Sequence, residues 1–160
     1  MVSPPDPAAP WAPAARTVLI VHQDDCFSST LQCHLEEHGW TVSRTATGAH
    51  ALRAWDELDP RLLIVELDAQ DRDGFLLLDE VARRQDRPPV LVLSHDRAVE
   101  SLSPEVRHSL GIDVAVSRPV RFATLTVLLE LLFDQRWSTP PESGVDATRS
   151  TGEEPLCRAS

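Results

Sequence analysis

The sequence lacks the long apolar run that a transmembrane helix requires, because none of its hydrophobic stretches approaches about 20 residues. It holds only three cysteines, Cys26, Cys33 and Cys157, and none forms a CxxC pair. A disulfide framework and a zinc site are therefore disfavoured, and we expect a chain kept in the reducing cytoplasm. The first residues are rich in proline and alanine and carry no basic charge, so we also expect no secretory signal.

Basic residues are scarce and of a single kind. The chain has 15 arginines and no lysine against 25 acidic residues, which gives a formal net charge of −10. A chain this acidic is repelled by phosphate backbones. We therefore expect no direct binding to nucleic acid, and no contact with a membrane.

Two terminal segments lack the apolar residues that build a core. Residues 1–15 are rich in proline and alanine, and residues 138–160 are rich in Ser, Thr, Pro and Glu. Both compositions favour disorder, so we predict a disordered arm and a disordered acidic tail. The fold is then carried by residues 16–137, a length that suits one domain with its own core. We expect no DNA-binding output domain after Trp137, because the remaining segment is short and acidic.

Short apolar runs alternate with amphipathic stretches between these segments. Runs such as VLIV, LLIV and VLVL are typical of buried parallel strands. We predict strands at 18–21, 40–45, 62–65, 90–93 and 114–116, and helices at 26–38, 49–58, 75–84, 104–110 and 122–133. Their alternation predicts a three-layer α/β/α sandwich with a five-stranded parallel sheet of order 2-1-3-4-5. Sites in such folds lie at the carboxyl ends of the strands.

The predicted helix 104–110 is unusually short. Ser103 is a good N-cap, and Pro104 suits the first helical position but would break a helix interior. The pair therefore predicts a helix start here, preceded by a long loop over residues 95–102.

Helix 26–38 carries four residues that could bind a metal or react. His34 and His38 are spaced i, i+4, which could chelate a metal, but no third ligand lies nearby, so we predict surface histidines. Cys26 and Cys33 are spaced i, i+7, and we predict small core residues there rather than redox partners.

The ordered motifs resemble the receiver domain of bacterial two-component response regulators. The motifs lie between Val18 and Phe133: VLIV, EEHGWTV, ATGAHAL, LLIVEL with a later DGF, VLVLS and GIDVAVSRPV. The resemblance implies a flavodoxin-like fold and a phosphorylation pocket. In that family an aspartate ending the third strand accepts a phosphoryl group and two acids after the first strand help bind Mg²⁺. A Ser/Thr and a lysine then hold the phosphoryl oxygens.

This sequence departs from the family pattern at most of the pocket positions. His22 and Gln23 stand where the acidic pair is expected, and Glu66 stands at the phosphoacceptor position, seven residues before Asp73-Gly74. His and Gln are poor ligands for Mg²⁺, which prefers oxygen atoms. We therefore predict a degenerate pocket that is not phosphorylated, formed by His22, Gln23, Asp24, Glu66, Ser94 and Arg118.

Three of these pocket positions retain part of the pattern. Ser94 keeps the hydroxyl, Arg118 replaces the lysine, and Asp24 is a retained third acid that we expect to face the loop. The aromatic switch residue of the family is replaced by Ala115. We hypothesise that Glu66 and Arg118 form a buried ion pair that imitates the phosphorylated arrangement; the alternative is that each bonds only to loop backbone.

The resemblance then implies a stand-alone pseudo-receiver that binds proteins in a signalling pathway. We expect no enzymatic activity and no cofactor. In the family, partners dock on the face formed here by helix 104–110, strand 114–116 and helix 122–133, and we expect a protein partner there, with a homodimer left open.

Two alternatives to this interpretation remain. One is a working receiver phosphorylated at Glu66 or Asp68, with Mg²⁺ bound through Asp24 and Asp25. The other is a small-ligand-binding flavodoxin-like domain. The loop HQDDCFSS carries two acids instead of a Gly/Ser/Thr-rich phosphate cradle, which disfavours flavin mononucleotide.

Overall fold

A computed structural model describes residues 15–67 and 72–138 of the chain. Five strands form one parallel sheet of order β2-β1-β3-β4-β5, as the sequence predicted. The strands are β1 (Thr17–Val21), β2 (Thr41–Thr45), β3 (Leu62–Glu66), β4 (Val90–Ser94) and β5 (Val114–Ser117). The predicted arm and nearly all of the predicted tail lie outside the described residues.

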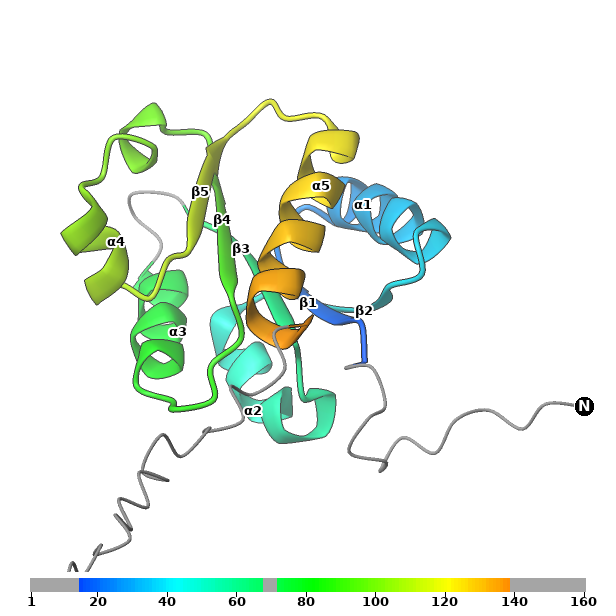
Figure 1. The fold of residues 1–160 in the computed structure, drawn as a ribbon, viewed down its shortest axis with the longest axis horizontal. Helices are drawn as coiled ribbons and strands as arrows, with labels where there is room; N and C mark the ends of the chain where they lie inside the picture. Colours follow the sequence, from blue (N-terminus) through cyan, green and yellow to red (C-terminus); the bar gives the residue numbers. More distant parts are fainter. Residues whose placement is uncertain (1–14, 68–71, 139–160) are drawn as a thin grey trace, which may run out of the picture.

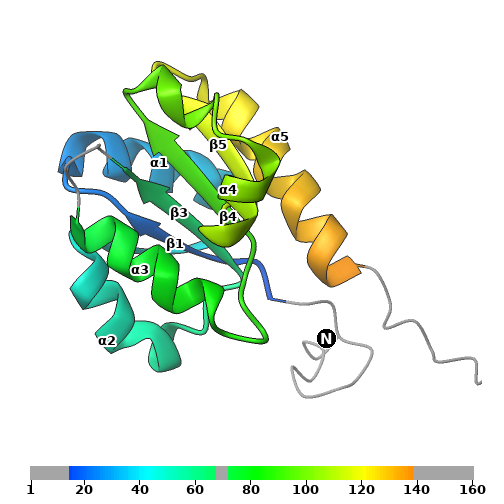
Figure 2. The ribbon, with the colours of Figure 1, turned by 90° about the vertical axis from the view of Figure 1, so that its left-hand side faces the viewer.

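In the described part of the chain, five α-helices cover both faces of the sheet (Figures 1 and 2). Helices α1 and α5 lie on one face, and α2, α3 and α4 lie on the other (Figure 1). The helices are α1 (Asp25–Glu37), α2 (Gly48–Leu58), α3 (Arg72–Ala82), α4 (Pro104–Ser109) and α5 (Phe122–Phe133). This is the predicted three-layer α/β/α sandwich.

The buried side chains alternate between the two faces along each central strand. In β1, Val18 and Ile20 join the core under α1 and α5, whereas Leu19 and Val21 join the core under α2 and α3. Strands β3 and β4 follow the same rule, and every residue of β4 is buried. Because both faces are covered, these strands read as continuous apolar runs in the sequence. Strand β5 lies at the edge of the sheet, and its four residues are half-buried.

The short helix α4 begins where the sequence predicted. The Ser103 side chain accepts a hydrogen bond from the Val106 amide, and Pro104 occupies the first turn. The loop before it contains a 3₁₀ turn over Arg97–Val99. None of the residues of α4 is buried, so the helix is not anchored by an apolar face of its own.

Helix α3 begins three residues earlier than predicted, at Arg72. The Asp73-Gly74 pair, which resembles a turn in the sequence, lies inside its first turn. An acidic side chain is favourable there because it faces the positive end of the helix dipole. Gly74 is buried, and the start of α3 lies so close to α2 that a Cβ on Gly48 would come within 2.7 Å of the Asp73 carbonyl oxygen.

The prediction for the two cysteines of α1 is wrong. Cys26 and Cys33 are both exposed. Leu31 and Leu35 define the buried face of this helix, and Cys33 lies two residues from each, about 200° around the helix axis. The third cysteine, Cys157, lies outside the described residues.

Candidate functional site at the carboxyl ends of the strands

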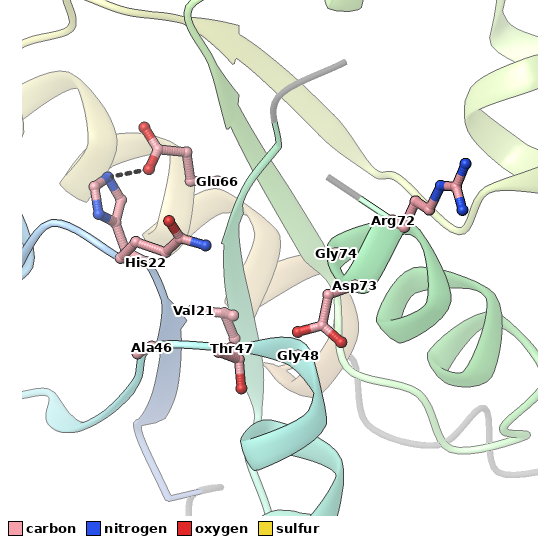
Figure 3. Close-up of a pocket in the computed structure, with 10 residues that line it drawn as sticks. Val21, His22, Ala46, Thr47, Gly48, Glu66, Arg72, Asp73 and Gly74 are labelled. Carbon is pink, nitrogen blue, oxygen red and sulfur yellow. Dashed lines mark ion pairs between the residues drawn. The ribbon is translucent and has the colours of Figure 1, made fainter. Parts of the chain in front are cut away.

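The predicted pocket residues follow or end four neighbouring strands. His22 follows β1, Glu66 ends β3, Ser94 ends β4 and Arg118 follows β5. The carboxyl ends of parallel strands share one edge of the sheet, so the fold brings these residues to the same region. Figure 3 shows the His22 imidazole and the Glu66 carboxylate directed toward one another from their two strands.

The Glu66 carboxylate is bound on both oxygens. Its Oε1 lies 2.8 Å from Nη1 of Arg118, and its Oε2 lies 2.8 Å from Nε2 of His22. The side chains of Glu66 and Arg118 are each 16% exposed, and that of His22 is 1% exposed. Residues 22, 66 and 118 therefore form a largely buried cluster, hereafter the Glu66 cluster.

The hydrogen bonds of His22 identify its tautomer. Its Nδ1 accepts a hydrogen bond of 2.9 Å from the backbone N–H of Asp24, so Nδ1 carries no proton. The proton of the neutral ring then lies on Nε2, which donates to Glu66. Burial is the main cause that lowers the pKa of His22, opposed by the charge of Glu66 and reinforced by that of Arg118. A neutral His22 leaves Glu66 and Arg118 as a compensated pair of charges.

Arg118 is held by aromatic and backbone contacts as well as by Glu66. Its guanidinium carbon lies 3.9 Å from the centre of the Phe27 ring, a cation–π contact. The Phe27 ring also stacks on His22, with 4.8 Å between the ring centres. The backbone N–H of Arg118 donates to the Ser94 carbonyl oxygen over 2.8 Å. The arginine is thus tied to β3 through its side chain and to β4 through its backbone.

The carboxylate of Asp24 caps a helix, whereas its backbone N–H donates to His22 of the Glu66 cluster. Its carboxylate accepts hydrogen bonds from the amides of Cys26 and Phe27, at the N-terminus of α1. The bond from the Phe27 amide, followed by that from the Cys26 amide, lowers the pKa of Asp24. This agrees with the expectation that Asp24 faces the loop. Gln23 is exposed and lines the adjoining pocket.

Ser94 and His95 complete the surroundings of Glu66. Ser94 is fully buried, and its hydroxyl accepts a hydrogen bond from the Asp96 amide over 3.0 Å. His95, which the sequence did not point to, places its Nε2 3.5 Å from Oε1 of Glu66 and 3.3 Å from Nη1 of Arg118. Its position directly after β4 is the signal that could have identified it. Asp68, the alternative phosphoacceptor, lies outside the described residues.

An open pocket of about 460 Å³ adjoins the Glu66 cluster between the starts of α2 and α3. His22 and Glu66 form one wall, and Asp73 lies opposite, where its carboxylate accepts a hydrogen bond from the Ala49 amide. The Arg72 side chain points away from Glu66 (Figure 3). The carboxylates of Glu66 and Asp73, which face this space, are therefore already engaged with protein groups.

The residues at this site do not fit Mg²⁺. That ion requires oxygen ligands in near-octahedral geometry, and here a neutral imidazole and an exposed amide follow β1. Both oxygens of Glu66 already accept hydrogen bonds from nitrogen. Over residues 15–67 and 72–138, no group of three His, Cys, Asp or Glu side chains is arranged to hold a metal ion.

The two histidines of α1 are also engaged in protein contacts. Nε2 of His34 lies 2.9 Å from the Thr126 hydroxyl, and Nδ1 of His38 lies 2.7 Å from the His34 carbonyl oxygen. His38 is exposed on α1, as predicted for a surface histidine, whereas His34 is half-buried against α5.

Comparisons with known proteins identify relatives for most of the chain. The family model described as "Response regulator receiver domain" matches residues 18–130. The "Regulator of RpoS" of Escherichia coli K12 is 29% identical over 118 residues, which are 74% of this chain and 34% of that protein. The "Transcriptional regulatory protein CssR" of Bacillus subtilis is 23% identical over 126 residues, covering 78% of this chain and 54% of that protein. The chain thus spans about a third to half of these relatives.

Solved receiver structures share the fold. A CheY-like receiver domain from Methanospirillum hungatei superposes with a TM-score of 0.67 at 19% identity, covering 77% of this chain and 97% of that one. The receiver domain of a Francisella response regulator gives a TM-score of 0.66 at 19% identity, covering 75% and 98%. Among the residues that the structure describes, no helix has the length and apolarity to cross a bilayer.

Proposed function

Because this chain belongs to the response regulator receiver domain family, we propose that it acts in signal transduction as a protein-interaction module that does not depend on phosphorylation. The observation that supports this proposal is the Glu66 cluster. Glu66 at the phosphoacceptor position is bound by Arg118 on one oxygen and by His22 on the other, each over 2.8 Å. A carboxylate with both oxygens engaged is a weak nucleophile toward phosphorus.

In the Glu66 cluster, protein side chains provide the charge pairing between strand ends that a metal ion and a phosphoryl group would otherwise provide. It connects the ends of β1, β3 and β5 through one carboxylate and one guanidinium. Removing one member of a buried ion pair leaves an uncompensated charge and costs about 3–5 kcal/mol. The pair therefore favours a single arrangement of these loops that does not depend on phosphorylation of the chain.

The proposed partner surface is formed by α4, β5 and α5. Val106 on α4 and Val127 and Leu131 on α5 are large apolar side chains that remain exposed. The edge strand β5 between these helices is only half-buried. Exposed apolar groups beside a sheet edge that no further strand pairs with favour a protein partner. A second copy of the chain is an alternative occupant.

Acetyl phosphate provides a direct test of phosphorylation independence. We would incubate the protein with acetyl phosphate and Mg²⁺ and measure its intact mass, and treat the variants Glu66→Gln and Asp68→Asn in the same way. The proposal predicts no added phosphoryl group in any of them. A modified fraction in the native protein that disappears in Glu66→Gln, or in Asp68→Asn, would contradict it and would identify the acceptor.

A further inference from the structure

Helix α4 buries no residue of its own; the apolar residues Leu102 and Leu110 that flank it pack partly buried against the core, and polar contacts add to them. The helix has six residues, none of them buried, and Val106 on it is 42% exposed. Six residues are too few for a helix that is stable by itself in water. Its position must therefore depend on contacts made by the loop before it and the turn after it.

Glu100 makes two such contacts from the loop between β4 and α4. Its carboxylate Oε1 accepts a hydrogen bond of 2.7 Å from the backbone N–H of Ser117, at the end of β5. Its backbone carbonyl oxygen accepts a hydrogen bond from the Arg107 guanidinium of α4. One residue of the loop is thus bonded both to α4 and to the edge strand.

The Ser117 amide is a group that the sheet itself does not satisfy. The neighbouring strand β4 uses its Ser94 carbonyl oxygen to accept the N–H of Arg118, one residue further on. The Ser117 N–H therefore points to the edge of β5 that no strand pairs with. There the Glu100 carboxylate accepts its hydrogen bond, as the carbonyl of a further strand would. Because the next residue is Arg118, a single peptide bond separates this contact from the Glu66 cluster.

The electrostatic surroundings favour the charged form of Glu100. The hydrogen bond from the Ser117 amide is the main cause that lowers the pKa of Glu100, and the charges of Arg97 and Arg107 add to it. Arg97 lies in the 3₁₀ turn, Arg107 on α4 and Ser117 on β5, so the groups that face Glu100 come from each element packed against it.

We propose that Glu100 is a positioning residue that fastens the β4–α4 loop and α4 to the edge strand β5, and so fixes this part of the partner surface. The inference rests on the proposed function in one respect, which is that α4, β5 and α5 form a partner surface. It adds that the surface is held by a specific bond between Glu100 and Ser117.

Amide exchange measured by NMR on the full chain tests this role. Glu100→Ala should accelerate hydrogen exchange at the Ser117 amide by about tenfold or more and shift the resonances of residues 95–109. Glu100→Gln keeps a carbonyl oxygen as acceptor and should retain most of the protection. Glu57→Ala, at an exposed glutamate of α2, is the matched control and should leave Ser117 unchanged.

A pH titration separates the role of the carboxylate from a general loosening of the fold. A carboxylate with a lowered pKa keeps its bond above the ordinary glutamate range and loses it as the pH falls through the lowered value. The native Ser117 amide resonance should follow that titration, and the titration should vanish in Glu100→Gln. Unchanged exchange at Ser117 in Glu100→Ala, or the same titration in Glu100→Gln, would overturn the proposal. Phosphorylation is measured separately by mass. A chain that is phosphorylated, but whose Ser117 amide exchange still depends on Glu100, would refute only the proposed function.

Discussion

Glu66 and His22 form a hydrogen bond of 2.8 Å between the carboxylate Oε2 and the imidazole Nε2, at the boundary of β3 and β1. The bond has a defined direction, because Nδ1 of His22 accepts the Asp24 amide and the ring must therefore donate through Nε2. In a receiver-type pocket these two positions belong to the phosphoacceptor and to an acidic residue. Here the two residues are joined through one carboxylate oxygen of Glu66, and the other oxygen pairs with Arg118.

The neutral state of His22 predicts a loss of stability in acid. Its pKa is lowered in the folded protein, so the folded state binds this proton less readily than the unfolded state does. The stability that neutral His22 contributes is fully present above the ordinary histidine pKa of about 6.5. It is lost as the pH falls through the lowered pKa of the folded state. The urea midpoint should therefore decrease below pH 6.5, and the decrease should be smaller in His22→Gln, which keeps a donor toward Glu66 but cannot titrate.

Other groups also titrate in acid, so the comparison needs a control. His50→Gln, which removes an exposed histidine of α2, is the matched control variant. Equal pH dependence in the native protein and in His22→Gln would show that His22 is not responsible.

Removing the charge of Glu66 should destabilise the fold. In Glu66→Gln the Arg118 guanidinium remains largely buried without its counter-charge, and we expect a loss of about 3 kcal/mol in the free energy of unfolding. The double variant Glu66→Gln/Arg118→Gln should recover part of this loss, because it also removes the unpaired charge. Equilibrium urea denaturation measures both. A Glu66→Gln protein as stable as the native one would show that the ion pair has no structural role.

Asp24 should behave as a helix cap rather than as a metal ligand. Its carboxylate accepts the Cys26 and Phe27 amides, so Asp24→Ala should lower the urea midpoint, while Asp24→Asn should retain most of the stability. Neither substitution should change the response to Mg²⁺. An Mg²⁺-dependent rise in the melting temperature that disappears in Asp24→Asn would assign the residue to a metal site instead.

The sequence was sufficient for the fold because local signals agreed with one another. The runs VLIV, LLIV and VLVL identified the central strands, since those strands are covered on both faces and need no polar side. Ser103 and Pro104 together located the start of α4. The start of α3 was predicted three residues too late, although the helix dipole favours an acid such as Asp73 in the first turn.

The candidate site was predictable only in part. The positions of His22, Glu66 and Arg118 followed from the order of strands, because the carboxyl ends of parallel strands meet at one edge. The contact of His95 with Glu66 and the bond from Ser117 to Glu100 depend on how loops fold back across the sheet, and no periodic pattern records this. The orientation of the cysteines could have been found, because Cys33 lies opposite Leu31 and Leu35 on a helix of 3.6 residues per turn.

Phosphorylation independence is tested most directly by an amide NMR titration with beryllofluoride, a mimic of the acyl phosphate, in the presence of Mg²⁺. A suitable positive control is the variant His22→Asp/Gln23→Asp/Glu66→Asp, which restores the acidic pair and the aspartate, with an active receiver domain from another protein as a second one. We predict that the native resonances of His22, Glu66, Ser94 and Arg118 do not move while those of the active receiver do. Saturable shifts of the native resonances that require Mg²⁺ would show that the pocket accepts a phosphoryl group and would contradict phosphorylation independence.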